Sequence, residues 1–316
     1  MRFYIWLGIL LLGACRQTDI PEGLPIWRGT YIVWQQDSLP HLGVWDGETW
    51  RPAVESTWLA GGSALKQIAA DQDCLWILGQ QPTTLNRIDL ATESIAKQLS
   101  DIPLPTPTQL AVGPDNILVG DSLAAALAFW LNRQENWIEV EPLASPTEIL
   151  YRAGRYYIAT TAPAVEVWHA QSLSRIANIP FEGQILSIQA DARNSVWVQT
   201  LSGGEIREAS IEINSQTIQS ASTASRFLAV QYSPYIRQQF GTEYTRTVVR
   251  SSDEVIRPGN IRNAPSFRTD FLGGEIYYVQ ADSLRRYNIQ QNTHTRLDAL
   301  QGTMHQMYAW WDFGLK

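Results

Sequence analysis

One stretch of the chain is rich in arginine and could bind anions. Residues 225–268 contain seven arginines and three acidic residues, within a chain whose formal net charge is −7. The arginines are Arg226, Arg237, Arg246, Arg250, Arg257, Arg262 and Arg268. A guanidinium group donates paired hydrogen bonds to a carboxylate or a phosphate. The stretch therefore predicts either an anion-binding surface or a solvated strand with alternating arginines.

The residues that usually catalyse reactions or bind metals are scattered along the chain. The histidines are His41, His169, His294 and His305, and their spacing is not that of metal ligands. Cys74 precedes the apolar stretch LWIL without a histidine or acid motif beside it, which predicts a buried, unreactive thiol. The sequence also lacks a nucleophile–histidine–acid motif, a P-loop and a dinucleotide-binding glycine pattern. We expect no bound cofactor and no metal site.

The elements that position these residues follow an internal repeat. The segment KQIAADQDCLWILG (66–79) returns as LSIQADARNSVWVQT (186–200). One aromatic or apolar residue marks the same place in each unit, and these marker residues are Trp76, Leu118, Tyr157, Trp197 and Tyr277. The intervals between them are 42, 39, 40 and 80 residues, and the last interval leaves room for one degenerate unit. The chain therefore repeats with a period near 40 residues.

Each unit predicts four β-strands. The strand that contains the marker is followed by outer strands such as TLNRIDLAT (84–92) and ESIAKQL (93–99). Apolar and polar residues alternate in these strands, and Gly, Asp, Asn and Pro separate them. The Ala-rich stretch DSLAAALAFWL (121–131) admits either a short helical insertion or a strand. Four strands in about 40 residues indicate one blade of a β-propeller.

We predict an all-β fold, a seven-bladed β-propeller. Six complete units begin at residues 65, 106, 146, 186, 226 and 265. Three strands remain at the N-terminal end (YIVWQQ, HLGVWDGE and TWRPAVE) and one at the C-terminal end (HQMYAWWDF). Together they complete one more blade, which closes the ring and removes exposed sheet edges. Six or eight blades are the alternatives.

The repeats resemble those of known propeller families. The inner hairpin IQADARNSVWVQT (188–200) is similar to the two-component-regulator type of propeller repeat. The outer hairpins LNRIDLATESIAKQL (85–99) and VEVWHAQSLSRIANIP (165–180) resemble YVTN repeats and quinoprotein-like (PQQ-type) repeats. The resemblance covers nearly all of the chain after its N-terminal segment. It implies the fold alone, because it carries no catalytic residue with it.

Four residues are candidates for a ligand site at the mouth of the central channel. In propeller families ligands often bind where the innermost strands begin. Arg226, Arg268 and His305 are placed at the beginnings of three neighbouring innermost strands, and Glu148 at the beginning of one across the channel. Such a positive arc would attract an acidic protein segment, a sugar acid or a phosphate. The alternative is that the arginines only pair with nearby carboxylates.

The N-terminus resembles the signal of a bacterial lipoprotein. Arg2 precedes an apolar run of about ten residues, which is too short to cross a bilayer as a helix. The run ends in LGAC (12–15), which resembles a lipobox, so Cys15 is expected to carry diacylglycerol and to become the first mature residue. An ordinary signal peptide cut near Ala14 is the alternative.

The chain is thus expected to have three segments. Residues 1–14 are the signal peptide, residues 15–26 a lipidated linker and residues 27–316 a single β-propeller domain. In enteric lipoproteins an aspartate after the lipidated cysteine often signals retention in the inner membrane, and Arg16 stands there instead. We therefore expect an anchor in the outer membrane, on its periplasmic or its surface side. The membrane contact is then the lipid alone.

We expect a monomeric, non-catalytic binding or scaffold protein of the bacterial cell envelope, for an envelope protein or a small anionic ligand. A net charge of −7 and a pI near 5.2 argue against a nucleic-acid partner and a polybasic membrane patch. One alternative is a propeller enzyme, either a metal-dependent lactonase or lyase or a quinone-dependent dehydrogenase. Another is a glycan-binding module that uses some of the thirteen tryptophans. Trp34, Trp76 and Trp197 fall on the repeat phase, however, which favours packing.

Overall fold

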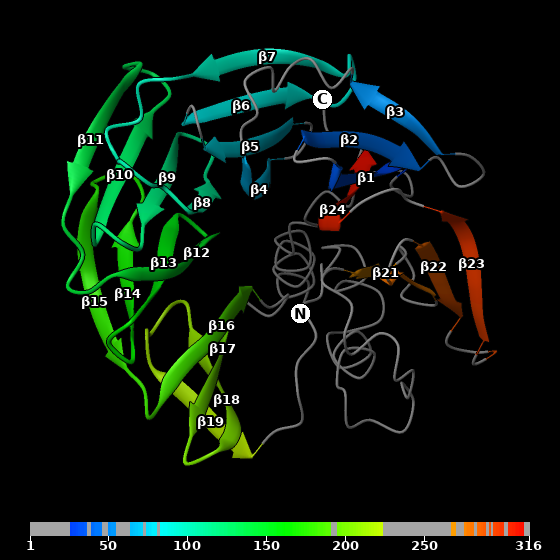
Figure 1. Cartoon of the computed structure of the whole chain (residues 1–316). Coiled ribbons are helices and arrows are strands. Elements are labelled where there is room, and N and C mark those ends of the chain that lie inside the picture. Colours follow the sequence, from blue (N-terminus) through cyan, green and yellow to red (C-terminus); the bar gives the residue numbers. More distant parts are fainter. Residues whose placement is uncertain are drawn as a thin grey trace, which may run out of the picture.

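Figure 1 shows a computed structural model of the chain. The described residues are 26–36, 39–45, 50–54, 64–71, 74–80, 83–190, 195–223, 267–269, 275–280, 283–288, 291, 293–299 and 303–312. Every regular element in these residues is a β-strand. The chain is therefore all-β in its described part, as predicted.

The strands form six antiparallel four-stranded sheets within the described residues. The first consists of β1 (Ile26–Gln36), β2 (Leu39–Trp45), β3 (Trp50–Val54) and β24 (Thr303–Asp312). The β4–β7 sheet consists of β4 (Ala64–Asp71), β5 (Cys74–Gln80), β6 (Thr84–Asp89) and β7 (Ser94–Leu99). The β8–β11 sheet consists of β8 (Gln109–Val112), β9 (Asn116–Asp121), β10 (Ala126–Leu131) and β11 (Asn136–Val140).

The other three sheets repeat this order. The β12–β15 sheet consists of β12 (Pro146–Arg152), β13 (Arg155–Thr160), β14 (Ala164–His169) and β15 (Ser174–Pro180). The β16–β19 sheet consists of β16 (Gln184–Ala190), β17 (Ser195–Ser202), β18 (Glu205–Glu212) and β19 (Ile218–Thr223). The β20–β23 sheet consists of β20 (Phe267–Thr269), β21 (Glu275–Gln280), β22 (Ser283–Asn288) and β23 (Thr293–Ala299).

The sheets are arranged around a common centre (Figure 1). Their innermost strands contact one another in the order β20, β24, β4, β8, β12 and β16. This arrangement of four-stranded antiparallel sheets is consistent with a β-propeller. The number of blades and the closure of the ring stay predictions, because the unit that begins at residue 226 lies outside the described residues.

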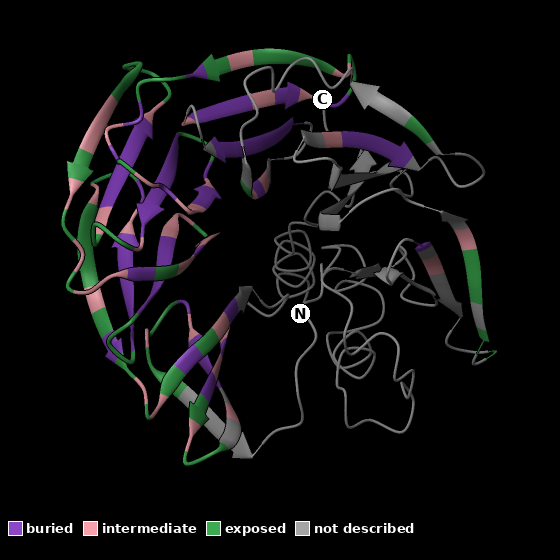
Figure 2. Cartoon of the chain, viewed as in Figure 1, coloured by how far each residue is buried: buried purple, intermediate pink, exposed green. Residues whose placement is uncertain are grey.

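Burial follows the position of each strand in its sheet (Figure 2). β9 is buried along its whole length, and β13 and β14 nearly so. The outermost strands β7 and β15 are mostly exposed. A strand that is covered on both faces by neighbouring sheets needs apolar side chains at every position, whereas an outermost strand meets water.

Three apolar clusters fill the spaces between consecutive sheets from β4 to β19. The first joins the β4–β7 and β8–β11 sheets around Trp130, and the second joins the β8–β11 and β12–β15 sheets around Phe129. The third joins the β12–β15 and β16–β19 sheets around Tyr157. In the second cluster the hydroxyl of Tyr156 donates a hydrogen bond of 2.6 Å to Oδ1 of Asn116. This hydrogen bond links the β8–β11 and β12–β15 sheets across their interface.

The two ends of the chain meet in one sheet, in the strand order β24-β1-β2-β3. The pairing of β24 with β1 runs from Asp312 opposite Ile26 to Thr303 opposite Gln35. Three N-terminal strands and one C-terminal strand thus form the sheet that the sequence predicts for the last blade.

The Ala-rich stretch 121–131 is a turn followed by β10, so the strand alternative is the correct one. β10 pairs with β9 on one side and with β11 on the other. Phe129 and Trp130 are both buried, and they belong to two different apolar clusters, one on each face of the strand. Pairing on both sides satisfies the backbone of β10 without a helix.

Candidate functional site

The connections between strands lie on two opposite sides of the sheets, because successive connections in an antiparallel sheet alternate. We call one side the connection face; it contains the β9–β10, β13–β14 and β17–β18 turns and the β11–β12 and β15–β16 connections. The other side, the hairpin face, contains the β8–β9, β10–β11, β12–β13 and β14–β15 turns. The hydroxyl of Ser122 donates to the carbonyl of Pro146 at 2.6 Å, which ties the β9–β10 turn to the next sheet.

Asp121 fixes the β9–β10 turn on the connection face. Its side chain is fully buried at the end of β9. Its carboxylate accepts the backbone N–H groups of Leu123 and Ala124, both at 2.9 Å. It also accepts the backbone N–H of Thr106 at 2.7 Å and the hydroxyl of the same residue. Burial raises the pKa of Asp121, but the hydrogen bonds from Ala124, Thr106 and Leu123 outweigh it and hold the pKa below its usual value.

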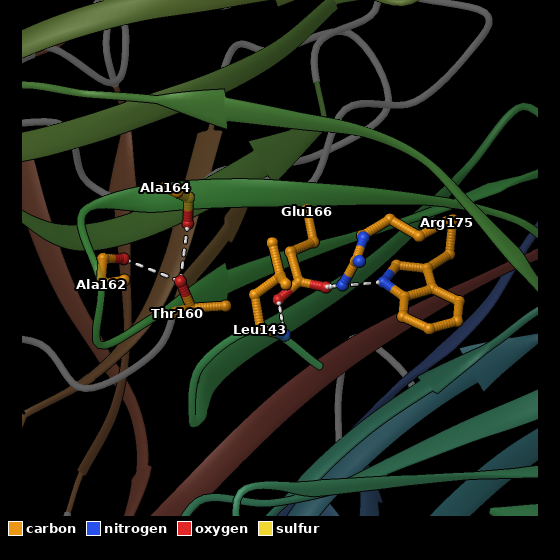
Figure 3. A network of polar contacts seen from close by, with 7 residues as sticks. Leu143, Thr160, Ala162, Ala164, Glu166 and Arg175 are labelled. Atoms are coloured by element: carbon orange, nitrogen blue, oxygen red, sulfur yellow. Dashed lines mark hydrogen bonds and ion pairs between the residues drawn. The ribbon is translucent and has the colours of Figure 1, made fainter. Parts of the chain in front are cut away.

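Glu166 fixes the β11–β12 connection on the same face (Figure 3). Its side chain is fully buried in β14, and Oε1 accepts the backbone N–H of Leu143 at 2.6 Å. Oε2 accepts the indole N–H of Trp168 at 3.1 Å and lies 3.4 Å from Nη1 of Arg175. The carboxylate therefore links a connection to the interior of the following sheet.

Thr160 fixes the β13–β14 turn (Figure 3). Its hydroxyl donates to the carbonyl of Ala162 at 2.7 Å and lies 3.1 Å from the carbonyl of Ala164. Thr160 lies three residues after its marker, Tyr157. Asp121 lies three residues after the marker of the preceding unit, Leu118. The same register position thus holds the turn after the second strand in two neighbouring sheets.

Large apolar side chains are exposed on this fixed backbone. The exposed fractions are 84% for Leu123, 59% for Leu143, 43% for Leu186 and 37% for Leu201. Leu123 and Leu143 lie in the β9–β10 turn and the β11–β12 connection, and Leu186 and Leu201 lie at the ends of β16 and β17 on the same side. The other exposed large apolar side chains among the described residues lie on outermost strands, and they are Ile95, Ile176 and Ile218. The described turns of the hairpin face thus have none.

Three of the described innermost strands have a β-bulge near their beginning. The residues at the bulge are Lys66 in β4, Thr147 in β12 and Leu186 in β16, and all three side chains are exposed. His305 occupies the corresponding place in β24, opposite the register shift between Val33 and Trp34. A bulge lets one residue of a strand leave the regular pairing, so this position presents its side chain apart from the sheet.

The position after the bulge links neighbouring innermost strands. Oε1 of Gln67 in β4 accepts the backbone N–H of Leu110 in β8 at 2.6 Å. Oε2 of Glu148 in β12 accepts the backbone N–H of Ile188 in β16 at 2.8 Å. The two side chains occupy the same register position and make the same bond to the next sheet.

Glu148 has the most perturbed carboxyl group at this position. Burial among protein atoms raises its pKa to about 7, although the hydrogen bond from the N–H of Ile188 favours the ionised form and lowers it. A carboxyl group with this pKa takes up or releases a proton near neutral pH. Its fixed bond to a backbone N–H gives it a structural role in the ring of innermost strands.

The other predicted site residues are described in part or not at all. Cys15 and Arg226 lie outside the described residues. Arg268 lies in β20 and pairs with the marker Tyr277, whereas Glu148 precedes the partner of its own marker by two residues. Arg268 and Glu148 therefore occupy different register positions, two residues apart. The positive arc at the mouth of the channel stays a prediction.

A second feature is a cavity of about 250 Å³ on the hairpin face, between the β8–β11 and β12–β15 sheets. Its lining includes Asp115, Tyr151, Arg155 and His169. Nδ1 of His169 accepts the backbone N–H of Ser172 at 3.2 Å, so a neutral imidazole has its proton on Nε2. The cavity is lined by an acidic group, a basic group and neutral side chains that form hydrogen bonds, so it can hold a small polar molecule.

The fully or largely buried carboxyl groups of Asp121, Glu148 and Glu166 hold backbone N–H groups. Within the described strands and turns, no three His, Cys, Asp and Glu side chains are placed to bind one metal ion. Cys74 is buried, as expected for a packing residue. No helix of the described segments is long and apolar enough to cross a membrane.

Comparisons with known proteins found similarity in structure. Hydrazine synthase of Kuenenia stuttgartiensis aligns with a TM-score of 0.46 and 13% identity, over 76% of this chain and 68% of that chain. A chain of the crystal structure of a nidogen/laminin complex aligns with a TM-score of 0.49 and 12% identity, over 88% and 97% of the two chains. At these values the likeness carries no argument about function. No protein-family model and no curated protein sequence matches the chain.

Proposed function

We propose that the chain is a lipid-anchored β-propeller of the bacterial cell envelope that acts as a rigid, non-catalytic platform for a partner protein. The anchor is Cys15, at the end of LGAC (12–15), and Arg16 after it favours the outer membrane. Two or more acyl chains on one cysteine anchor a protein stably without a spanning helix, because each buried CH₂ group contributes about 0.8 kcal/mol.

The use of the buried carboxyl groups supports a rigid platform. Asp121, Glu148 and Glu166 each accept a backbone N–H from a connection or from the next sheet. A general acid or base must exchange its proton with a substrate. These carboxyl groups instead hold separate segments in one conformation, and a preorganised surface binds a partner with a smaller loss of entropy.

The anchor is tested by growing cells that produce the full chain with radiolabelled palmitate. The wild-type protein should become labelled, and Cys15→Ala should remove the label. Cys74→Ala is the matched control and should keep it, because that thiol is buried in the fold. An unlabelled wild-type protein that is cut near Ala14 contradicts the lipid anchor.

The platform is tested by chemical crosslinking of the full chain in intact envelopes. We expect one defined partner protein to remain attached through stringent washing in detergent. The proposal is wrong if no partner is found and the purified protein hydrolyses lactones, oxidises alcohols with a quinone, or holds a divalent metal through dialysis. Specific binding of a glycan or a small anion, without a partner protein, contradicts it as well.

A further inference from the structure

We infer that the connection face of the β8–β19 sheets is the docking surface of the platform, and that it binds a protein segment with apolar side chains flanked by lysine or arginine. This inference rests on the proposed function and adds the surface and the chemistry of the partner. Three observations carry it: the exposure of the leucines, the fixing of their backbone, and the charges beside them.

Hydrogen bonds from the backbone to buried carboxylates hold two of the exposed leucines of this face in place. Leu123 follows Asp121 by two residues, and its own N–H is held by that buried carboxylate. The N–H of Leu143 is held by the buried carboxylate of Glu166. The two side chains are nevertheless 84% and 59% exposed. An apolar side chain on a fixed backbone can bind a partner at a smaller entropy cost, because little freedom remains to be lost on binding.

The leucine-bearing segments form one continuous surface. Ser122 bonds to Pro146, which joins the turn of Leu123 to the connection that contains Leu143. In the next sheet the N–H of Thr161 donates to the carbonyl of Ser145 at 2.9 Å, so the β13–β14 turn adjoins the same connection.

The surface continues to the β16–β19 sheet. The N–H of Phe181 donates at 2.7 Å to the carbonyl of Pro163, which is exposed beside the exposed Ala162. Beyond Phe181, Gly183 has φ +84° and lies against the backbone of Leu201, so a side chain would not fit there. Exposed apolar residues are therefore found on adjoining segments of three consecutive sheets, whereas such residues are ordinarily scattered singly over a protein exterior.

The charged groups beside the leucines are mostly acidic. Asp101 and Glu141 are exposed on the β7–β8 and β11–β12 connections. Glu182 is 81% exposed on the β15–β16 connection and pairs with Arg207 at 2.9 Å. Lysine or arginine beside the apolar side chains of a partner would complement this rim and speed the encounter. Anionic phospholipid headgroups would be repelled by it, so the rim favours a protein over a membrane surface.

Site-specific crosslinking tests the surface in the full-length protein in cells. A photoreactive phenylalanine analogue is placed at position 123 or 143, and at position 95 or 176 as the control. Ile95 and Ile176 are also exposed apolar residues, 39% and 41%, but they lie on outermost strands. We expect protein adducts from 123 and 143 at least tenfold above those from 95 and 176, with the linked partner peptide rich in apolar residues and Lys or Arg. Adducts to phospholipid from 123 and 143, or equal protein adducts from all four positions, overturn the inference.

Substitution provides the second test. Leu123→Ser combined with Leu143→Ser should reduce the recovered partner at least tenfold without lowering the melting temperature, because both side chains are already in water. Ile95→Ser combined with Ile176→Ser should leave recovery unchanged. If the wild type binds a partner that the leucine variant also binds, the docking surface is wrong and the platform stands. If the wild type itself binds no partner, the proposed function fails.

Discussion

The connection face and the hairpin face belong to the same strands but are held by different kinds of contact. On the connection face a carboxylate buried inside a sheet reaches a distant segment, as Asp121 reaches Thr106 and Glu166 reaches Leu143. On the hairpin face the outer turns are closed by their own residues: Oδ1 of Asp89 accepts the N–H of Thr92 at 2.8 Å. Contacts between sheets occur there as well, since Nδ2 of Asn116 donates to the carbonyl of Ala170 at 2.6 Å. Buried carboxylates therefore hold the connection face, whereas the outer turns of the hairpin face depend on local turn geometry.

The turns of the hairpin face also share one backbone conformation. Four outer turns contain a residue with positive φ that is not glycine, and these residues are Glu93, Glu135, Leu173 and Gln216, at 52°, 52°, 52° and 56°. Ala125, in the β9–β10 turn of the connection face, has the same conformation with φ 51°. An L-residue in this region is strained by about 1 kcal/mol. We therefore expect the outer turns of the hairpin face to tolerate sequence changes. The connection face, in contrast, requires the buried carboxylates of Asp121 and Glu166.

The largest effect is expected from Asp121→Ala, which should lower the free energy of unfolding by about 3–5 kcal/mol because it removes a buried carboxylate that accepts three backbone N–H groups. Asp89→Ala is the matched change on the hairpin face and should lower it by about 1 kcal/mol, since water can replace that acceptor. Urea unfolding of the two variants measures the difference. Equal losses would remove the distinction between the faces.

The pH dependence of the wild type sharpens this prediction. The pKa of Asp121 is lowered in the folded state, so its contribution is present above the unfolded value of about 3.8 and is lost as the pH falls through the folded pKa. The wild type should therefore lose stability relative to Asp121→Ala when the pH falls below about 4. A constant difference down to strongly acidic pH would show that Asp121 acts through packing alone.

A smaller effect of opposite sign is expected from Glu148→Gln, in the ring of innermost strands. Because burial raises the pKa of Glu148 to about 7, its ionisation destabilises the fold as the pH rises from about 4.5 to 7. A glutamine can accept the N–H of Ile188, as Gln67 accepts that of Leu110. The variant should be more stable by about 1–3 kcal/mol at pH 8 and equal to wild type at pH 4, measured by urea unfolding. A gain that is independent of pH would contradict the raised pKa.

The smallest effect is expected from Gln216→Gly on the hairpin face. Glycine adopts positive φ without strain, so the variant should gain about 0.5 kcal/mol. Gln216→Ala keeps the β-carbon and should gain nothing. Thermal unfolding of both variants decides whether the local turn limits stability, and a loss on introducing glycine would show that the side chain of Gln216 matters more than the strain.

The sheets were predictable because each marker residue sits at one register position. Trp76, Tyr157 and Trp197 each face the innermost strand at the same place, opposite Ala69, Leu150 and Gln189. Strand periodicity is a local property of the sequence, so it can be recognised without the fold.

Trp34 does not hold the marker position to which the repeat phase assigned it. In β1 the marker position is held by Tyr31, which pairs with Tyr308. Tyr308 lies two residues after Gln306, the residue that follows the bulge in β24. The bulge in β24 shifts the count, and a bulge cannot be located from alternation alone when several aromatic residues stand close together.

The connection face was missed because its partners are distant in sequence. The arginine-rich stretch can be recognised from its composition. Glu166, in contrast, is a single acidic residue in the strand AVEVWH, and it contacts Leu143 only in the folded chain. The available signal was a carboxylate inside or at the end of a buried apolar strand, at Glu166 and in NILVGD at Asp121. A buried charge needs hydrogen-bond partners, so such a position indicates a fixed contact even before the partner is known.

The pairing of β1 with β24 has a consequence for the order in which the chain folds. A strand formed at the beginning of synthesis finds its neighbour only when the last residues have emerged, since Ile26 faces Asp312. Until then the edge of β1 offers unpaired backbone groups to any other extended chain. Contacts of such long range also slow folding. The pairing of β24 with β1 therefore completes this sheet late in folding, and β1 is prone to aggregation until it forms.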